Sequence, residues 1–388
     1  MTQCRLVLIL TLTGLVLAGC QGGNRPDSTG TAGTGSGSTS TAPKAATSLK
    51  PTGHLIEPYN ARKIGYGLLW ATSIGMQKNT TVRSWIFDNI LILAEGEPAN
   101  IVTAINVKNG TTMWRRKIGQ SIHRIRGVAR KDEIILVNTE AELRLIEAET
   151  GRLLNSQRLD QVVAGSPVIS GDLAVFGGIH GKVFAHDIAT GSPKWRYNVR
   201  GGIVSNPVDA QNNHVFVADS SGFYAMFLAT NGKKLWDGKT FGKITTQAIA
   251  SNLGLFIACE DHNLYALNKN DGRDRVGWPY RTQVPLRANP VILDRYLFLQ
   301  IRGRGLVAID AARRTDLWEK KTDARPVAIV REGLLLVDKN KLILVDVQKG
   351  NKLNEVSVKT LETAVPGPKR SLILISPGGR ILRLDPLA

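Results

Sequence analysis

The chain of 388 residues carries a net charge of +18 at pH 7, and 43% of its side chains are hydrophobic. This hydrophobic content is typical of a folded protein and excludes a chain that is disordered throughout. The three cysteines are Cys4, Cys20 and Cys259, and the first two lie near the amino terminus, which excludes a fold held by intrachain disulfides. The excess of Lys and Arg indicates attraction to anionic partners and does not bear on the fold.

Residues 1–19 are predicted to be an export signal. A basic residue precedes an apolar run from Leu6 to Leu17, which is shorter than the roughly 20 residues needed to span a bilayer. The segment Leu17-Ala18-Gly19-Cys20 resembles the lipobox of bacterial lipoproteins, and this resemblance implies that Cys20 carries acyl chains. An ordinary signal peptide cut nearby is the alternative.

Residues 20–60 are predicted to be the lipidated cysteine and a disordered tether. From Gln21 to about Pro58 the chain is mostly Gly, Ser, Thr, Ala and Pro with scattered charges, so it has almost nothing to bury. In the lipoprotein class, Gln21 after the cysteine implies sorting to the outer membrane. We therefore expect a folded body, residues 61–388, that is held at the periplasmic face of the outer membrane by its lipid anchor.

A short phrase is repeated eight times along this body. Each copy is an apolar-rich run that ends in Asp, Asn or a substitute, usually with Gly four residues later and Trp four residues after that. The copies follow one another at steps of 36 to 42 residues. A period of about 40 residues in a strand-rich sequence is typical of a β-propeller with four strands in each blade. The copies span 102–106, 143–147, 183–187, 223–227, 264–268, 306–310, 342–346 and 381–385.

The clearest copy predicts strands at 204–208, 214–218 and 223–229, with a fourth beginning at 233. The Gly after each phrase supplies a positive φ at a hairpin, and the Asx side chain is expected to bond the turn backbone. A Trp that recurs once per blade is expected to pack between blades and not to bind a ligand. The Gly position holds Gly110, Gly151, Gly191, Gly232, Gly272 and Gly350, with Arg314 in one copy; the Trp position holds Trp114, Trp195, Trp236, Trp278 and Trp318, with Asn155 and Asn354 in the weaker copies.

The two ends of the body predict a closed ring. The last copy stops soon after Asp385 with no fourth strand, whereas Tyr66–Ile74 looks like a fourth strand that lacks the other three. We therefore predict an all-β, eight-bladed propeller of four-stranded antiparallel blades, closed by an N-terminal strand that completes the last blade. Seven blades is the alternative, because the copies from residue 318 onward are the weakest.

No catalytic, cofactor-binding or metal-binding residues are predicted. The sequence has no glycine run in the context of a phosphate loop and no nucleophile elbow. Its six histidines lack the spacing of metal ligands. Cys259 lies in an apolar stretch and is expected to be a small buried residue and not a reactive thiol.

Basic residues are the remaining signal, and they crowd one blade junction. They are interpreted either as a solvated rim or as a patch that attracts anionic lipid, phosphate or an acidic protein surface. Nucleic acid is not an expected partner outside the cytoplasm. The patch consists of Arg115, Arg116, Lys117, Arg124, Arg126, Arg130 and Lys131.

With the lipobox, the tether and eight Asx–Gly–Trp repeats, the chain resembles the BamB family of outer-membrane assembly lipoproteins. The repeat itself is of the type found in pyrroloquinoline-quinone (PQQ) enzymes. The resemblance implies a protein without catalytic activity or cofactor that is a monomer within a complex. It implies binding to the barrel-inserting protein BamA, with nascent outer-membrane proteins as further partners. It also implies that the partner binds loops that leave the third and fourth blades. On this sequence those loops contribute Val199, Arg200 and Gly201, and then Lys243 and Ile244.

The second of these loops departs from the family pattern, because Gly242 and Ile244 replace acidic residues. Two other functions therefore stay open. One is a general envelope-binding propeller for an anionic glycan, lipid or protein. The other is a PQQ-dependent dehydrogenase, a class that is typically longer and carries a vicinal cysteine pair, which this sequence lacks.

Overall fold

The computed structural model describes residues 55–77, 81–119, 123–199, 201–204, 207–211, 213–330 and 333–387. These residues all belong to one compact unit, Ala45–Ala388. The predicted export signal, Cys20 and the tether up to residue 54 lie outside them. Within the part that the structure describes, no helix is long and apolar enough to cross a bilayer.

Eight separate four-stranded antiparallel sheets make up the described chain, and seven of them use four consecutive strands. Blade 1 contains β2 (Val82–Phe87), β3 (Ile90–Glu95), β4 (Ile101–Asn106) and β5 (Thr112–Lys117); blade 2 contains β6 (Gly127–Lys131), β7 (Ile134–Asn138), β8 (Glu142–Glu147) and β9 (Leu153–Arg158); blade 3 contains β10 (Val168–Ser170), β11 (Leu173–Gly177), β12 (Lys182–Asp187) and β13 (Pro193–Asn198); blade 4 contains β14 (Val208–Asp209), β15 (His214–Ala218), β16 (Phe223–Leu228) and β17 (Lys234–Lys239).

The remaining sheets follow in the same order around the ring, and the last of them takes its fourth strand from the start of the body. Blade 5 contains β18 (Ile249–Ser251), β19 (Gly254–Ala258), β20 (Asn263–Leu267) and β21 (Tyr280–Arg281); blade 6 contains β22 (Val291–Leu293), β23 (Tyr296–Ile301), β24 (Gly305–Asp310) and β25 (Thr315–Lys320); blade 7 contains β26 (Arg325–Val330), β27 (Gly333–Asp338), β28 (Lys341–Val345) and β29 (Lys352–Ser357); blade 8 contains β30 (Thr363–Pro366), β31 (Leu372–Ile375), β32 (Arg380–Pro386) and β1 (Tyr66–Ser73).

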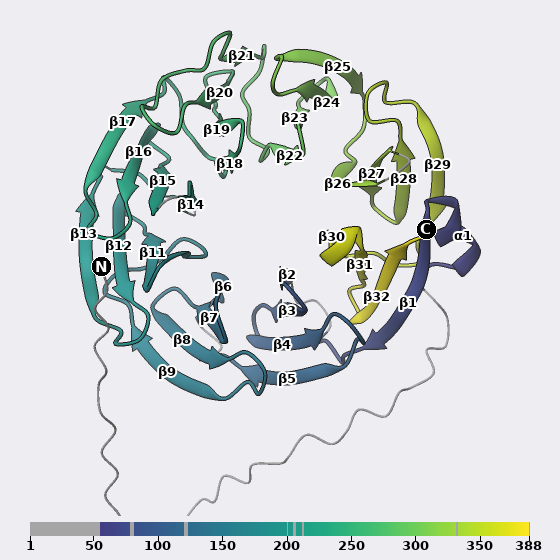
Figure 1. Ribbon diagram of the computed structural model, residues 1–388, viewed down its shortest axis with the longest axis horizontal. Helices are drawn as coiled ribbons and strands as arrows, with labels where there is room; N and C mark the ends of the chain where they lie inside the picture. Colours follow the sequence, from purple (N-terminus) through teal and green to yellow (C-terminus); the bar gives the residue numbers. More distant parts are fainter. Residues whose placement is uncertain are drawn as a thin grey trace, which may run out of the picture. The chain divides into compact units, whose positions relative to one another are not determined.

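The blades stand around a common axis, with the first strand of each blade innermost and the fourth outermost (Figure 1). The eight-bladed propeller predicted from the repeat is therefore confirmed, and the seven-bladed alternative is wrong. One boundary in the clearest copy differs from the prediction. Its first strand is β14 at Val208–Asp209, and Val204 instead forms an isolated bridge with Asp219.

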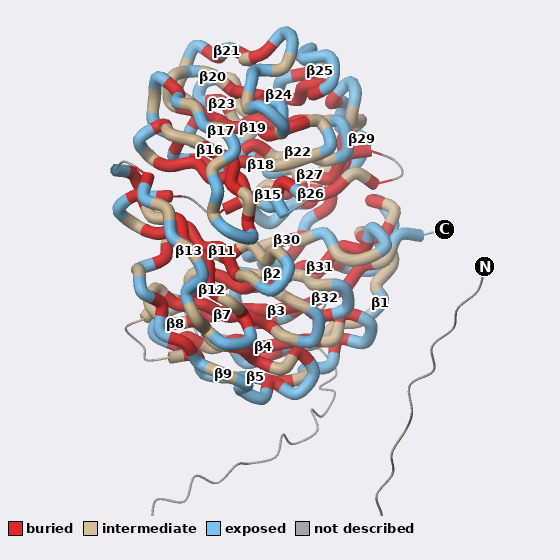
Figure 2. Tube along the Cα trace, turned by 60° about the vertical axis from the view of Figure 1, so that its left-hand side comes forward, coloured by how far each residue is buried: buried red, intermediate tan, exposed pale blue. Residues whose placement is uncertain are grey.

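The core lies within and between the blades, along the middle strands (Figure 2). The third strand of nearly every blade is almost entirely buried because each of its faces packs on a neighbouring blade. For example, Val102 and Ala104 of β4 are fully buried, as are Val183 and Ala185 of β12. This two-sided burial explains why the repeated phrase is a continuous apolar run and does not alternate with polar residues.

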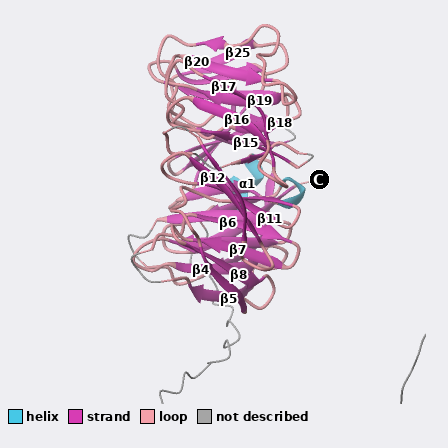
Figure 3. Cartoon of the chain, turned by 90° about the vertical axis from the view of Figure 1, so that its left-hand side faces the viewer, coloured by secondary structure: helices cyan, strands magenta, loops and turns pink. Residues whose placement is uncertain are grey.

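The connections gather at the two faces of the ring, which Figure 3 shows edge-on. We call one the connection face: it carries the loops between successive blades, such as 201–204 and 240–248, and the turns between strands two and three of each blade. We call the other the hairpin face: it carries the turns between strands one and two and between strands three and four, such as 229–233. Because the strands of each blade are antiparallel, every blade contributes to both faces in the same way.

The N-terminal strand closes the ring as predicted. Strand β1 pairs antiparallel with β32, from Tyr66 opposite Pro386 to Ser73 opposite Arg380. The side chain of Trp70 on β1 then donates a hydrogen bond to the carbonyl of Val107 in blade 1 at 2.8 Å. Blade 8 therefore contains both ends of the propeller. Strand β1 covers the edge that β32 would otherwise leave unpaired.

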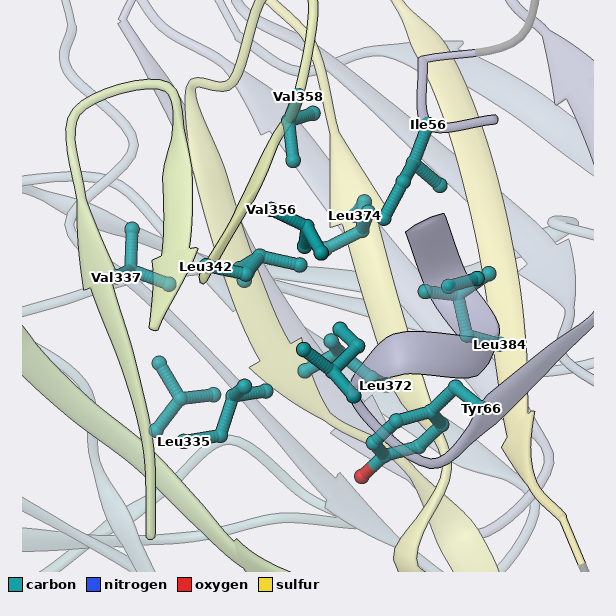
Figure 4. Packing of buried hydrophobic residues seen from close by; sticks show 14 of the residues in the cluster. Ile56, Tyr66, Leu335, Val337, Leu342, Val356, Val358, Leu372, Leu374 and Leu384 are labelled. Atoms are coloured by element: carbon teal, nitrogen blue, oxygen red, sulfur yellow. The ribbon is translucent and has the colours of Figure 1, made fainter. Parts of the chain in front are cut away.

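A short segment ahead of β1 packs across the joint between blades 7 and 8. Leu55 and Ile56 are buried, and helix α1 (Pro58–Lys63) follows them. Their side chains join a cluster with Val358 and Leu374, which Figure 4 shows together with Tyr66. The described residues therefore begin within the segment 20–60 expected to be tether, and its apolar Leu55 and Ile56 are packed in the core.

The predicted role of the repeated Gly and Trp as turn and packing residues is visible at five joints. The Trp side chain of one blade lies on the Gly of the next blade's hairpin and donates a hydrogen bond to a carbonyl in that hairpin. A Cβ atom on Gly151, for example, would lie 2.5 Å from Cγ of Trp114, whose Nε1 bonds the Ala148 carbonyl at 2.7 Å. The five tryptophans are Trp70, Trp114, Trp195, Trp236 and Trp318.

Two joints are built differently from the prediction. In blade 2 the side chain that covers the next hairpin is Gln157, whose Nε2 bonds the Ile188 carbonyl at 3.2 Å; it is not Asn155. In blade 5, Trp278 packs on Phe256 of its own blade. No tryptophan of blade 5 therefore covers the next hairpin, and this is the hairpin at which Arg314 replaces Gly.

The Asx position also needs one correction. Asp187 accepts the backbone N–H of Thr190 at 2.8 Å and Asp346 accepts that of Gln348 at 2.9 Å, as expected for a turn-capping side chain. In blade 4, however, the residue whose backbone closes the hairpin is Leu228, bonded to Lys233, and not Phe227. The fourth copy is therefore 224–228, since two neighbouring apolar residues made either alignment possible.

Candidate functional site

The loop between blades 3 and 4 presents an apolar side chain on a fixed backbone. Ile203 exchanges two hydrogen bonds with Ser220, one from the Ile203 N–H to Oγ at 2.9 Å and one from the Ser220 N–H to the Ile203 carbonyl at 3.0 Å. Gly202 lies so close to this turn that a Cβ atom would stand 2.8 Å from Cγ of Asp219. The Ile203 side chain is 54% exposed.

The loop between blades 4 and 5 repeats this arrangement. The backbone N–H of Phe241 donates to Oδ2 of Asp261 at 3.2 Å, and the hydroxyl of Tyr265 donates to the same oxygen at 2.6 Å. Gly242 has no space for a side chain, because a Cβ atom would stand 2.5 Å from the Asp261 nitrogen. The phenyl ring of Phe241 is fully exposed.

Burial and the neighbouring carboxylate raise the pKa of the Tyr265 hydroxyl well above its usual range, so it remains a hydrogen-bond donor. The hydrogen bond from Tyr265 therefore holds in place the Asp261 oxygen that also accepts the Phe241 N–H. A hollow of about 550 Å³ beside Phe241 is lined by Asp261, Tyr265 and Arg281, among others. This places an exposed aromatic ring next to a polar recess on the connection face.

The residues predicted to bind the partner have different places. Val199 and Ile244 are buried, each filling the core beneath its loop. Gly201 is exposed with a positive φ of 97°. Lys243 is exposed as well, and its carbonyl accepts the Glu260 N–H. Arg200 lies outside the described residues. These assignments remain predictions, and the large apolar side chains that the described parts of the two loops expose are those of Ile203 and Phe241.

The sequence interpretation missed Ile203 and Phe241. The available signal was an apolar residue next to glycine in a loop between repeats. Such a loop lacks the regular strand pattern from which burial of an apolar side chain is predicted. Ile203 follows Gly201 and Gly202, and Phe241 precedes Gly242. Ile244 and Val204 look equally apolar in the sequence, but the loop backbone turns them inward.

The predicted basic patch is divided over three surfaces. Arg115, Arg116 and Lys117 lie on the outermost strand β5, whereas Arg124 and Arg126 lie on the connection face. Arg130 and Lys131 end the innermost strand β6 at the hairpin face. The structure therefore does not bring the seven residues together.

Six of the seven have polar partners. Arg115 pairs with the buried carboxylate of Glu95 at 2.7 Å, Arg124 with Glu97 at 3.1 Å and Arg130 with Asp88 at 3.1 Å. Arg126 pairs with Glu140, Lys131 with Asp172, and Arg116 bonds the Gly151 carbonyl. Among the described residues, only Lys117 of this set has neither an ion pair nor a side-chain hydrogen bond. Much of the positive charge here is therefore balanced locally.

The remaining titratable candidates have structural surroundings. Cys259 is buried under the loop 240–248, and this burial raises the pKa of its thiol. Its Sγ approaches the Lys243 carbonyl at 3.4 Å. Within the described ranges, no group of three or more His, Cys, Asp or Glu is arranged to hold a metal ion.

A family model described as outer membrane protein assembly factor BamB matches residues 98–253 and 241–367, together well over half of the chain. The chain belongs to the BamB family. A search of curated proteins gave no significant match. The family match confirms the resemblance inferred from the repeats.

Comparison with solved structures gives the same fold. The BamB structure from Moraxella catarrhalis has a TM-score of 0.65 and 17% identity, covering 82% of this chain and 97% of that one. The computationally designed protein Ika8 has a TM-score of 0.63 and 14% identity, covering 81% and 98%. Quinohemoprotein alcohol dehydrogenase from Comamonas testosteroni has a TM-score of 0.63 and 13% identity, covering 84% and 77%. At these identities the likeness shows the fold alone.

Proposed function

We propose that this BamB-family protein is a non-catalytic scaffold of outer-membrane β-barrel assembly. It would be anchored at the periplasmic face of the outer membrane through acylated Cys20, with the segment after Cys20 as its tether. Its partner would be a BamA-like barrel-inserting protein, within a complex in which this chain is a monomer. The observation that carries the proposal is the family match across most of the propeller.

The connection face of blades 3 to 5 supports this proposal as the partner surface. Interfaces draw most of their affinity from a few apolar or aromatic anchors on preorganised backbone. Ile203 and Phe241 have this character, because their loops are fixed by Ser220 and Asp261 while their side chains remain exposed. The predicted Val199–Gly201 and Lys243–Ile244 segments would contribute by shaping the same two loops.

The proposal is tested by recovering partners from solubilised membranes with the tagged full-length protein. We expect the wild-type protein to recover the barrel-inserting protein. The variants Ile203→Glu and Phe241→Glu should each weaken binding at least tenfold (about 1.4 kcal/mol or more), since a desolvated apolar anchor becomes a charge.

The matched control is Val276→Glu. Val276 is as exposed as Phe241 but lies in the hairpin 268–279 on the hairpin face. It should recover the partner as the wild-type protein does. Failure of the wild-type protein to recover any barrel-inserting protein would contradict the proposed function. Equal losses in all three variants would contradict the assignment of the connection face as the partner surface.

A further inference from the structure

The connection face has a second recess, away from the partner surface. It has a volume of about 600 Å³ and lies where blades 5, 6 and 7 meet. Its walls are the loop 285–288, the turn 300–305 and the loop 321–323. Three of its lining side chains are cations, Arg287, Arg302 and Lys321, and one is a carboxylate, Asp323.

The turn 300–305 carries two arginines, of which Arg304 is paired with carboxylates of the described residues and Arg302 is not. Arg304 pairs with Glu319 at 2.7 Å and with Asp316 at 3.2 Å, so its charge is balanced at the joint between blades 5 and 6. Arg302, two residues earlier, is exposed and lines the recess. Within the part of the chain that the structure describes, it has neither an ion pair nor a side-chain hydrogen bond.

Lys321 stands on the opposite wall, also exposed and without a carboxylate partner in the described ranges. The loop that carries it is fixed, because Nε2 of Gln300 donates to the Thr322 carbonyl at 2.6 Å. Gly305 permits this close approach: a Cβ atom there would stand 2.8 Å from Cα of Lys321. The two walls are therefore held against each other before any ligand arrives.

Arg287 adds positive charge at the third wall. Its Nε lies 3.0 Å from a carboxylate oxygen of Glu260, and its side chain is 68% exposed, so solvent weakens this pairing. Asp323 is the opposing charge in the recess and accepts a long bond from Gln300 at 3.4 Å. The lining thus has an excess of positive charge, unlike the locally balanced cations of β5 and β6.

We propose that this recess binds a phosphate group, with Arg302 and Lys321 as donors and Arg287 as a supporting charge. Guanidinium and ammonium groups are the side chains that bind phosphate oxygens most strongly, and a preorganised recess lowers the entropic cost. The phosphate belongs either to a phospholipid head group or to a free phosphate. The geometry favours the lipid, because the described chain begins at this face, where the Lys359 N–H bonds the Leu55 carbonyl at 2.8 Å.

The test uses the full mature protein in a zwitterionic detergent, titrated calorimetrically with inorganic phosphate and with soluble short-chain phosphatidylglycerol. Arg302→Ala and Lys321→Ala should each weaken binding about tenfold, which is the effect of losing one charge-assisted hydrogen bond. Asp323→Asn should tighten binding several-fold, since it removes the repelling charge; a misfolded variant would not bind more tightly. Binding of the lipid alone assigns the head group, and binding of phosphate alone assigns the free anion.

Two variants serve as matched controls. Arg196 is exposed on the outermost strand β13, and Lys233 is exposed on the hairpin face. Neither residue lines the recess. Arg196→Ala and Lys233→Ala should bind both ligands as the wild-type protein does. Absence of binding to either ligand, or equal losses in the control variants, would overturn the proposal. Partner recovery should be unchanged in Arg302→Ala, which separates this site from the partner surface.

Discussion

A single residue pair, a tryptophan on one blade and a glycine on the next, accounts for most of the regular joints of the ring. The indole covers the hairpin and bonds its carbonyl, and the glycine leaves room for the ring while adopting a positive φ. An aromatic ring buried in this way removes a large apolar area from water. The joint therefore explains why the two most regular residues of the repeat are structural.

Trp114→Ala should lower the free energy of unfolding by about 3–5 kcal/mol, the usual cost of deleting a buried aromatic side chain. Trp114→Phe should cost less, because the ring is largely kept and the bond from Nε1 to the Ala148 carbonyl is lost. Urea denaturation followed by circular dichroism measures both. A Trp114→Ala variant as stable as the wild-type protein would show that the Trp114 side chain does not stabilise the joint between blades 1 and 2.

Gly151→Ala should be much more destabilising than Gly171→Ala. Both glycines have a positive φ, 71° and 57°, but a Cβ atom on Gly151 would meet Trp114, whereas Gly171 has open space. We expect a loss of about 1 kcal/mol at Gly171 from backbone strain alone. Gly151→Ala should lose about 2–4 kcal/mol, since overpacking is added to the strain. Similar losses at both positions, measured by denaturation, would show that the ring contact does not matter.

His186 gives the stability a pH dependence. Burial lowers the pKa of its imidazole. The carboxylate of Asp160, whose Oδ2 lies 4.0 Å from Nε2, only partly opposes this effect. Its ring packs against Phe176 and Phe184, so the neutral form is the one that the fold accommodates. The unfolded chain therefore binds the proton more readily than the folded chain does.

The stability contributed by neutral His186 is complete above the ordinary pKa of about 6.5 and is lost as the pH falls from there toward the lowered pKa of the folded state. The denaturant concentration at the unfolding midpoint of the wild-type protein should decrease when the pH is lowered from 7.5 to 5. In His186→Gln this decrease should be smaller, because the residue no longer titrates. A variant that shows the full wild-type decrease would assign the pH dependence to other groups.

At the scale of elements, the strand β1 and the segment before it decide how the ring is closed. Strand β1 supplies the fourth strand of blade 8, and Leu55, Ile56 and Ile64 fill the groove between blades 7 and 8. The pairing strand was predictable because Trp70 keeps the period of the repeat. The packing segment was not, because two apolar residues in a polar run have no periodicity of their own.

Ile56→Ser should destabilise the protein by about 2–4 kcal/mol, since it empties a buried site and places a hydroxyl there. Tyr59→Ser, on the exposed side of helix α1, should change the free energy of unfolding by less than about 0.5 kcal/mol. Thermal unfolding of the two variants compares them directly. Equal effects would mean that the segment only rests on the surface.

Two further elements show what the sequence could not predict. The hairpin 268–279 of blade 5 is longer than the others, so the apparent Trp of that copy, Trp278, is displaced into its own blade. In blade 2 the covering side chain is Gln157, two residues beyond the aligned Asn155. In both cases the spacing locates the strand, but the side chain that reaches across the joint depends on its length and on the local backbone.

At the scale of the whole molecule, the period of the repeat predicted the fold because each blade buries its apolar strands only against its neighbours. The candidate surface was predictable to the level of two loops and no further. Within those loops, hydrogen bonds to Ser220 and Asp261 determine that Ile203 and Phe241 face outward while Val199 and Ile244 face inward. Whether a loop side chain faces outward therefore depends on hydrogen bonds between the loop and a turn of the following blade. A pattern of residue types does not reveal these bonds.

Site-specific photocrosslinking in cells tests the proposal that the connection face of blades 3 to 5 binds the barrel-inserting protein. A photoreactive amino acid replaces Phe241 in one strain and Val276, equally exposed on the hairpin face, in another. Mass spectrometry then identifies the crosslinked protein. We expect a crosslink to the barrel-inserting protein from position 241 and none from position 276. Crosslinks from position 276 alone, or none from either position, would contradict the proposal.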